Sequence, residues 1–203
     1  MSILIRNIIF DLGNVMLNFD PDQYLEDLGY HAKVKEKLKS EIFKTKEWLM
    51  LDRGTINQEA AIKIWQQRNP DLEAEINDVM TEWEKILTLK KDSLEILKFL
   101  AAKNYNLYIL SNFHEKAFAY VSNKYDFFNY FAGKIISADI GMIKPEPEIY
   151  DYLLEKYNLE AESTLFIDDS KKNIEAALKK GIRVIHFKDA ANLEEELKLY
   201  LRE

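Results

Sequence analysis

The sequence predicts an α/β fold, a doubly wound parallel sheet interrupted by an inserted all-helical domain. Three observations lead to this prediction. The run Ile8–Phe10 is apolar enough to be a strand covered on both faces, as the strands of parallel sheets are. After about residue 90, short apolar runs alternate with helical patterns, which indicates βαβ units. Between these two regions, apolar residues recur at helical spacing only.

The predicted core consists of short apolar strands, each followed by a helix. We expect strands at residues 8–10, 107–110, 134–137, 164–167 and 183–186. We expect helices at about residues 93–103, 114–125, 147–157 and 171–180, and near the glutamate run 194–196. This alternation is typical of a parallel sheet with helices on both faces.

The insertion is predicted to form roughly four helices. Asp20 and Pro21 are suited to the cap and first position of a helix. Turn-forming residues at 52–56 and 69–71 then interrupt the helical pattern. We therefore predict a core domain of residues 1–16 and 90–203 and a helical domain of residues 17–89.

Composition narrows the possible functions of the chain. Its 203 residues are 47% hydrophobic, enough for one large domain or a core with a modest insertion. A formal charge of −7 argues against nucleic acid or an anionic membrane as partner. The chain has no cysteine, which excludes disulfides, thiolate metal sites and a cysteine nucleophile. No secretory leader or apolar run of about 20 residues is present, so we expect a cytoplasmic protein.

Polar side chains follow several of the predicted strands. Asp11, Ser111–Asn112 and Asp168–Asp169 each come at a strand end, and Lys144 lies in the loop after another strand. In a parallel sheet these ends meet at one edge. Three carboxylates there are suited to Mg²⁺, while a hydroxyl, backbone amides and a lysine are suited to phosphate oxygens. A turn-capping role for Asp11 is the alternative, and the other strand ends argue against it.

In these motifs the chain resembles the haloacid dehalogenase-like hydrolase superfamily. The family's four motifs match, in order, Asp11–Val15, Ser111, Lys144–Pro145 and Asp168–Asp169. The helical insertion is similar to the family's C1-type cap. The branch that contains α-D-glucose-1-phosphate phosphatase is the most similar, because it shares Phe-Asp-Leu-Gly-Asn-Val, an Arg-Gly turn in the cap, and an Asn at the place of Asn173.

The resemblance implies a role for each motif residue. Asp11 would be the nucleophile and form an aspartyl-phosphate. Magnesium would lie between Asp11, the backbone carbonyl of Gly13 and the acidic pair. Asp169 aligns with the family's acidic residue and is favoured as the direct ligand, while Asp168 would bind directly or through water.

The resemblance also implies how the phosphoryl group is held and which substrate is used. Ser111, the backbone amide of Asn112 and Lys144 would stabilise the transferring group. Asn173 would orient the acidic pair. We therefore expect a magnesium-dependent phosphatase, a monomer or homodimer, that hydrolyses a small phosphorylated metabolite such as a hexose 1-phosphate.

Gly13 departs from the family pattern, because most phosphatases of the family carry there an Asp that acts as general acid and base. Three interpretations follow. The protein is a phosphatase in which water, substrate or another side chain moves the proton, with Asp20 as a candidate. It is a dehalogenase or a phosphonate hydrolase. The acidic pair counts against a dehalogenase, because the dehalogenases of the family work without metal. A phosphonate hydrolase would need a Schiff-base lysine in the cap, and Lys44, Lys46 and Lys63 fit no motif for it. Or it binds a phosphate ligand without turnover.

A few other side chains have two interpretations each. His114 either faces the site or lies on the surface at a helix start. Arg53 either reaches a substrate hydroxyl or phosphate or has a structural role. Trp48, Trp65 and Trp83 are expected to pack within the insertion rather than to stack on substrate.

Overall fold

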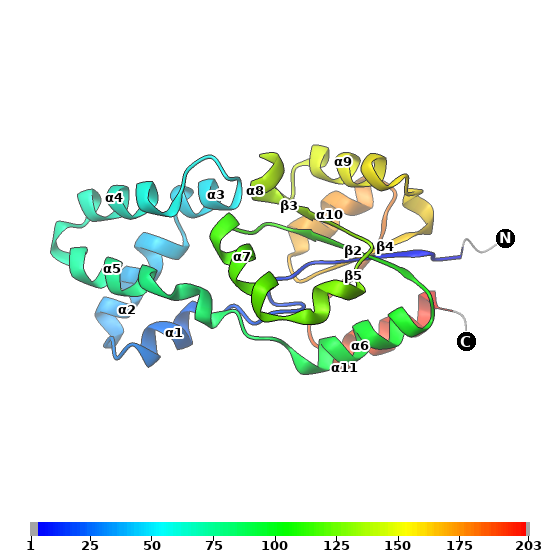
Figure 1. Ribbon diagram of the computed structural model, residues 1–203, viewed down its shortest axis with the longest axis horizontal. Helices are drawn as coiled ribbons and strands as arrows, with labels where there is room; N and C mark the ends of the chain where they lie inside the picture. Colours follow the sequence, from blue (N-terminus) through cyan, green and yellow to red (C-terminus); the bar gives the residue numbers. More distant parts are fainter. Residues whose placement is uncertain (1–3, 202–203) are drawn as a thin grey trace.

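The computed structural model describes residues 4–201, which form a five-stranded parallel sheet between helices with a further group of helices at one end (Figure 1). The strand order is β3-β2-β1-β4-β5, and every neighbouring pair is parallel. The strands are β1 Asn7–Phe10, β2 Asn106–Ser111, β3 Gly133–Ile136, β4 Thr164–Asp168 and β5 Arg183–His186. The predicted doubly wound parallel sheet is thus confirmed.

The central strand, β1, explains where the site lies. The side chains of Ile8, Ile9 and Phe10 are completely buried, as expected for a strand covered on both faces. Phe10 pairs with Ile109 of β2 and Ile167 of β4, so the carboxyl ends of these three strands are aligned. The chain adds β2 and β3 on one side of β1 and then crosses to β4 on the other. Ligands of such sheets bind at this switch point.

Helices cover both faces of the sheet (Figure 1). One face packs against α9 and α10, and the other against α6, α7 and α11. The core helices are α6 Lys91–Ala102, α7 Glu115–Lys124, α8 Ser137–Ile140, α9 Pro147–Tyr157, α10 Lys171–Lys179 and α11 Ala190–Tyr200, with 3₁₀ turns at Asp126–Tyr130 and Ala161–Ser163. The short helix α8 is absent from the sequence prediction, which extended the preceding strand to Ser137.

The insertion contains five α-helices rather than roughly four. They are α1 Pro21–Asp27, α2 Ala32–Leu38, α3 Lys46–Asp52, α4 Gln58–Arg68 and α5 Glu73–Thr81, with a π-helical turn at Lys39–Phe43 and 3₁₀ turns at Pro70–Leu72 and Trp83–Ile86. The additional break has a local cause. Gly29 has a φ of 82° in the turn after α1, a conformation that glycine adopts readily. The Thr45 hydroxyl then caps α3 by accepting from the Trp48 amide.

The two connections between the sheet and the insertion run side by side. The Asn18 amide donates to the Thr88 carbonyl at 2.7 Å, and the Lys90 amide donates to the Met16 carbonyl at 2.9 Å. Leu17 forms isolated bridges with both Gly13 and Leu89. These bonds fix the base of the insertion next to the loop after β1. The domain boundaries at residues 17 and 89 remain a prediction.

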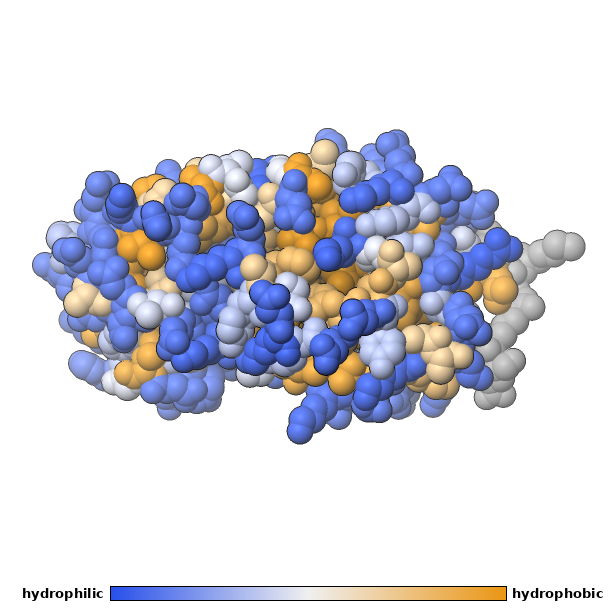
Figure 2. All heavy atoms as spheres, in the orientation of Figure 1, coloured by the Kyte–Doolittle hydropathy of each residue, from blue (hydrophilic) through white to orange (hydrophobic). Residues whose placement is uncertain are grey.

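The surface in the view of Figure 2 is largely hydrophilic, with hydrophobic residues exposed in separate small areas. Large apolar side chains that are exposed include Leu49, Phe99, Leu178 and Leu199. Within residues 4–201, none of the helices has the length and apolar character needed to cross a membrane.

Candidate active site

Asp11 immediately follows β1 and is buried at the aligned strand ends. Its Oδ1 accepts hydrogen bonds from the Leu12 amide at 2.7 Å and the Ser111 hydroxyl at 2.6 Å, and it lies 2.9 Å from Lys144 Nζ. Burial raises the pKa of Asp11 to about 7, although Lys144 and the Ser111 hydrogen bond favour the charged form. The contacts with Leu12, Ser111 and Lys144 therefore orient the Asp11 carboxylate, whose negative charge is unfavourable because the group is buried.

Lys144 lies between α8 and α9, and its side chain is almost completely buried. Nζ is 2.6 Å from Asp168 Oδ2 as well as 2.9 Å from Asp11 Oδ1. Asn112 holds the lysine backbone from both sides, because its Nδ2 donates to the Lys144 carbonyl and its Oδ1 accepts from the Lys144 amide. Burial lowers the pKa of Lys144, but the charges of Asp11 and Asp168 outweigh this and raise it above its ordinary value.

The two carboxylates of the acidic pair at the end of β4, Asp168 and Asp169, have different hydrogen-bond partners. Asp168 is fully buried and accepts from Lys144 Nζ, from the Ser170 amide and from Asn173 Nδ2 at 3.0 and 3.1 Å. Asp169 is partly exposed, and its Oδ2 accepts from Asn14 Nδ2 at 3.1 Å. Burial raises the pKa of Asp169, against the effect of Asn14. Asn173, predicted to orient the pair, contacts Asp168.

The carboxylates of Asp11, Asp168 and Asp169 form a possible metal site. One oxygen from each lies within 4.8 Å of the others. Burial raises the pKa of Asp11 and of Asp169, because it disfavours their negatively charged forms. A cation bound between the two carboxylates would compensate for these negative charges. A set of hard oxygen ligands with room for water and phosphate is what Mg²⁺ prefers. The donor set therefore fits the predicted cation.

A cavity of about 130 Å³ lies beside this cluster, between the core and the insertion. It is lined by Gly13, Phe19, Trp48, Asp52, Trp83, Leu87, Asn112, Phe113 and His114. The Trp48 and Trp83 ring centroids are 4.9 Å apart, and that of Trp48 is 4.3 Å from the His114 ring. Trp65 instead lies wholly within the insertion and donates to the Thr45 hydroxyl. Trp48 and Trp83 thus pack against each other and also line the cavity, whereas Trp65 only packs within the insertion.

Two lining residues, Asp52 and His114, add to the predicted site: Asp52 was not predicted as a site residue, and a position facing the site was one of the two interpretations of His114. His114 precedes α7 and is 5% exposed, so it faces the cavity rather than the surface. Its Nε2 is 3.3 Å from Asp52 Oδ1. Burial lowers the pKa of His114 to about 3 and raises that of Asp52 to about 8, with the Asp11 charge adding to the latter and Lys144 opposing it. Both side chains are therefore mainly uncharged at neutral pH.

The turn that carries Asp52 is docked on α8 of the core. The Ser137 hydroxyl donates to the Asp52 carbonyl. Arg53 forms an ion pair with Glu146 and donates to the Gly141 carbonyl at 3.1 Å. Gly54 has a φ of 74°, and a Cβ at this position would lie 2.4 Å from the Ala138 carbonyl oxygen. Arg53 is thus engaged by the core and does not line the cavity, which supports the structural interpretation.

Other candidates from the sequence lie away from the cavity. The Asp20 side chain is exposed and caps α1, where it accepts from the Gln23 amide at 3.0 Å. Lys44, Lys46 and Lys63 are also absent from the cavity lining. None of these four side chains is placed to act on a ligand held beside Gly13.

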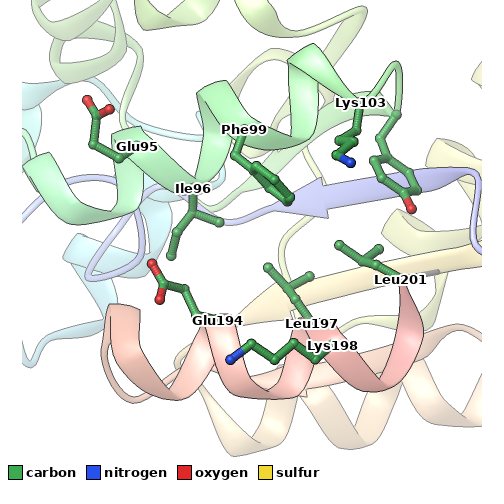
Figure 3. Close-up of a pocket in the computed structure, with 9 residues that line it drawn as sticks. Glu95, Ile96, Phe99, Lys103, Glu194, Leu197, Lys198 and Leu201 are labelled. Carbon is green, nitrogen blue, oxygen red and sulfur yellow. The ribbon is translucent and has the colours of Figure 1, made fainter. Parts of the chain in front are cut away.

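A larger cavity of about 660 Å³ lies between α6 and α11. Figure 3 shows Ile96 and Phe99 of α6 across from Leu197 of α11, with charged side chains around them. Its lining includes none of the predicted site residues and no cluster of metal-binding groups. Size alone does not make it the reactive site, whereas the smaller cavity adjoins converging polar groups with shifted pKa values.

Comparison with known proteins agrees with the motif analysis. A family model described as haloacid dehalogenase-like hydrolase matches residues 5–181. Drimenol cyclase drtB of Aspergillus calidoustus is 24% identical over 200 residues, but this chain spans only 36% of that protein. D-ribitol-5-phosphate phosphatase of Bacteroides thetaiotaomicron is 24% identical over 212 residues, a match that covers 98% of this chain and 99% of that protein.

A solved structure shows the same arrangement of elements. It is a HAD family enzyme from Bacteroides thetaiotaomicron in complex with magnesium and inorganic phosphate. The TM-score is 0.70 at 26% sequence identity, and the match covers 91% of this chain and 94% of that chain.

Proposed function

This chain belongs to the haloacid dehalogenase-like hydrolase family, and from this we propose that it is a magnesium-dependent phosphatase for a small phosphate monoester. The main support is the position of Asp11, a buried carboxylate at the end of the central strand. Ser111 and Lys144 contact it directly, and one oxygen of each carboxylate of the acidic pair lies within 4.8 Å of it. A carboxylate oriented in this way is suited to nucleophilic attack.

In the proposed reaction Asp11 forms the covalent intermediate. One oxygen of its carboxylate attacks phosphorus, the ester P–O bond breaks, and the alcohol leaves. Water then attacks the phosphorus of the aspartyl-phosphate, which releases phosphate and restores Asp11. Lys144 favours the charged form of Asp11 that attack requires. Together with Ser111 and the backbone amide of Asn112, it would hold the phosphoryl oxygens.

The metal is proposed to be held by Asp11, the Gly13 carbonyl and Asp169. Asp168 is already bound by Lys144 and twice by Asn173, while the carboxylate of Asp169 accepts one hydrogen bond from Asn14. This difference favours Asp169 as the direct ligand and leaves Asp168 to bind directly or through water. When bound, Mg²⁺ would neutralise charge between the attacking carboxylate and the anionic ester.

The cavity supports a small substrate. Its volume of about 130 Å³ is below the range of roughly 300–1,000 Å³ that is common for clefts binding drug-sized ligands. Its aromatic walls, Phe19, Trp48 and Trp83, offer flat apolar surfaces to a sugar or polyol. The D-ribitol-5-phosphate phosphatase among the relatives agrees with this class. We therefore propose a sugar phosphate or polyol phosphate, such as a hexose 1-phosphate, as substrate.

Gly13 favours one alternative, a phosphate-binding protein with little turnover. A glycine supplies no acid or base at a position where proton transfer is worth typically about 10²–10⁴-fold in rate. The binding residues would then be intact while the reaction is slow. Phosphate release is therefore the measurement that separates the two functions.

The test is a panel of sugar and polyol phosphates incubated with and without Mg²⁺. We expect phosphate release that requires Mg²⁺ and is lost in Asp11→Asn, which keeps the shape of the side chain but not the nucleophile. Asp20→Asn is the matched control, because asparagine caps a helix as well as aspartate does. Equal background release by the wild type and Asp11→Asn on all substrates would contradict the phosphatase, and retained ligand binding would then support the alternative.

A further inference from the structure

The space next to Gly13 is open to the cavity. A Cβ added to Gly13 would have no heavy atom within 4 Å apart from its chain neighbours. Asp52 lines the same cavity from the insertion, and His114 lines it from the core. The chain thus has an empty position where an acidic side chain would emerge from the core, and a carboxyl group that reaches the cavity from the opposite domain.

We propose that Asp52 is the catalytic acid and base of this site, in place of the side chain that Gly13 lacks. The inference rests on the proposed phosphatase function. The Asp52 carboxyl donates its proton to the ester oxygen as the P–O bond breaks, so the leaving group departs as a neutral alcohol. The Asp52 carboxylate then accepts a proton from the water that attacks the aspartyl-phosphate, which restores the acid for the next turnover.

The geometry of the insertion holds Asp52 at the cavity. The backbone carbonyl of Asp52 is bound by Ser137, and the neighbouring Arg53 is paired with Glu146 of the core. Gly54 permits close contact with Ala138, which a side chain would prevent. Three successive residues of the turn are therefore fixed on the core, and Asp52 is the one whose side chain lines the cavity.

His114 supports the assignment from the other side. Its Nε2 is buried and has no hydrogen bond of good geometry among residues 4–201. Asp52 Oδ1 lies 3.3 Å from this nitrogen. Catalytic hydrogen bonds are often long before the substrate is bound. A buried, unsatisfied nitrogen at this position is unfavourable unless a proton-bearing partner completes it, and the Asp52 carboxyl provides one.

The charges around Asp52 are consistent with this role. The charges of Asp11 and Lys144 of the core act on it, uncharged His114 lies beside it, and the next residue in the chain, Arg53, is paired with Glu146 of the core. Burial is the main cause of its raised pKa, about 8. The group is therefore largely protonated at neutral pH, which is the state that an acid requires, and its pKa is close enough to neutrality for it to act as a base in the second step.

The decisive experiment compares leaving groups. We expect Asp52→Asn to lower kcat/KM about 10²–10³-fold on alkyl and sugar phosphates, whose alcohols need a proton to depart. On an activated aryl phosphate, kcat/KM should change less than about threefold, because the aryl oxide leaves without a proton. The variant should also show a burst of aryl alcohol, since the base for hydrolysis of the aspartyl-phosphate is lost. Asp71→Asn, an exposed aspartate of the insertion, is the control.

A second variant tests the assignment by rescue. Adding Gly13→Asp to the Asp52→Asn variant should raise kcat/KM on alkyl esters about tenfold or more, because the added side chain has room and lies at the same cavity. Equal losses on aryl and alkyl esters, without a burst, would overturn the role of Asp52 while leaving the phosphatase in place. A wild type that hydrolyses no ester at all would instead refute the proposed function.

Discussion

The core and the helical insertion contribute to the same cavity by different means. In the core, Asp11, Ser111 and Asp168 lie at or just after the ends of buried strands, and the sheet register alone brings them together. In the insertion, Asp52 reaches the cavity only because its turn is docked on α8. The core side is held by paired strands and a buried lysine, whereas the insertion side is held by a few contacts across an interface. Substitutions on the core side and on the insertion side should therefore differ in their effects on stability and activity.

The largest effect is expected from Lys144→Met, which removes the cation between Asp11 and Asp168. Breaking a buried ion pair by removing one partner typically costs about 3–5 kcal/mol, so we expect a loss of stability of this order. Activity should fall at least about 10²-fold, because the phosphoryl group loses a fixed positive charge. Urea denaturation and phosphate release measure the two effects.

Magnesium provides an internal check on the Lys144 prediction. Saturating Mg²⁺ should recover part of the lost stability, because a cation at the carboxylates replaces some of the missing charge. Lys98→Met, which removes one partner of an exposed pair with Glu95, is the control and should leave both stability and activity unchanged. Equal denaturation midpoints for Lys144→Met and the wild type would show that the buried ion pairs do not organise the core side.

The sequence predicts the core side of the site better than the insertion side, and the reason is physical. Asp11 was predicted because an apolar strand of a parallel sheet leaves few places for the residue that follows it. Lys144, which lies in the loop between α8 and α9, was predicted from its Lys-Pro motif. Asp52 and His114 have no such pattern, since their burial and their 3.3 Å contact arise only when the insertion meets the core. Arg53 was noted in the sequence, but its pairing with Glu146 depends on the same docking.

The same distinction applies to the fold. The strands of the core were predicted nearly at their observed bounds, because buried apolar runs are unambiguous when helices separate them. The four-residue helix α8 is too short to show helical periodicity, and it was missed although it forms the surface on which the insertion docks. In the insertion, the break after α1 depends on one glycine with a positive φ. Elements that depend on one residue or on a tertiary contact are the ones that sequence periodicity does not predict.

A smaller effect is expected from Gly54→Ala, which tests docking alone. An alanine at Gly54 would need a positive φ and would place its Cβ 2.4 Å from the Ala138 carbonyl oxygen, so the turn has to move away from α8. Small misplacements of catalytic groups can cost about 10²-fold, and we expect a loss of about tenfold or more in kcat/KM on sugar phosphates. Steady-state kinetics on alkyl and aryl esters would measure it.

Gly29→Ala is the matched control for docking. Gly29 also has a positive φ, but a Cβ there meets no atom within 4 Å, so only the local backbone cost of about 1–2 kcal/mol applies. We expect reduced stability with unchanged kcat/KM. If the two alanine variants lose activity equally, loss of stability rather than loss of docking explains the effect of Gly54→Ala.

The last expected effect is a pH dependence of stability that originates on the insertion side. In the folded protein without Mg²⁺, the pKa of Asp52 is raised from 3.8 to about 8, chiefly by burial. Between these values the folded state keeps a proton that the unfolded state has lost, so the free energy of unfolding decreases as pH rises through this window. Asp52→Asn removes this contribution. Relative to the wild type, the variant should therefore become progressively more stable between pH 5 and pH 8 in urea denaturation with a chelator. Parallel curves for Asp52→Asn and the wild type would mean that Asp52 is ionised in the folded protein, as it would be if the turn left α8 and exposed the carboxyl group to water.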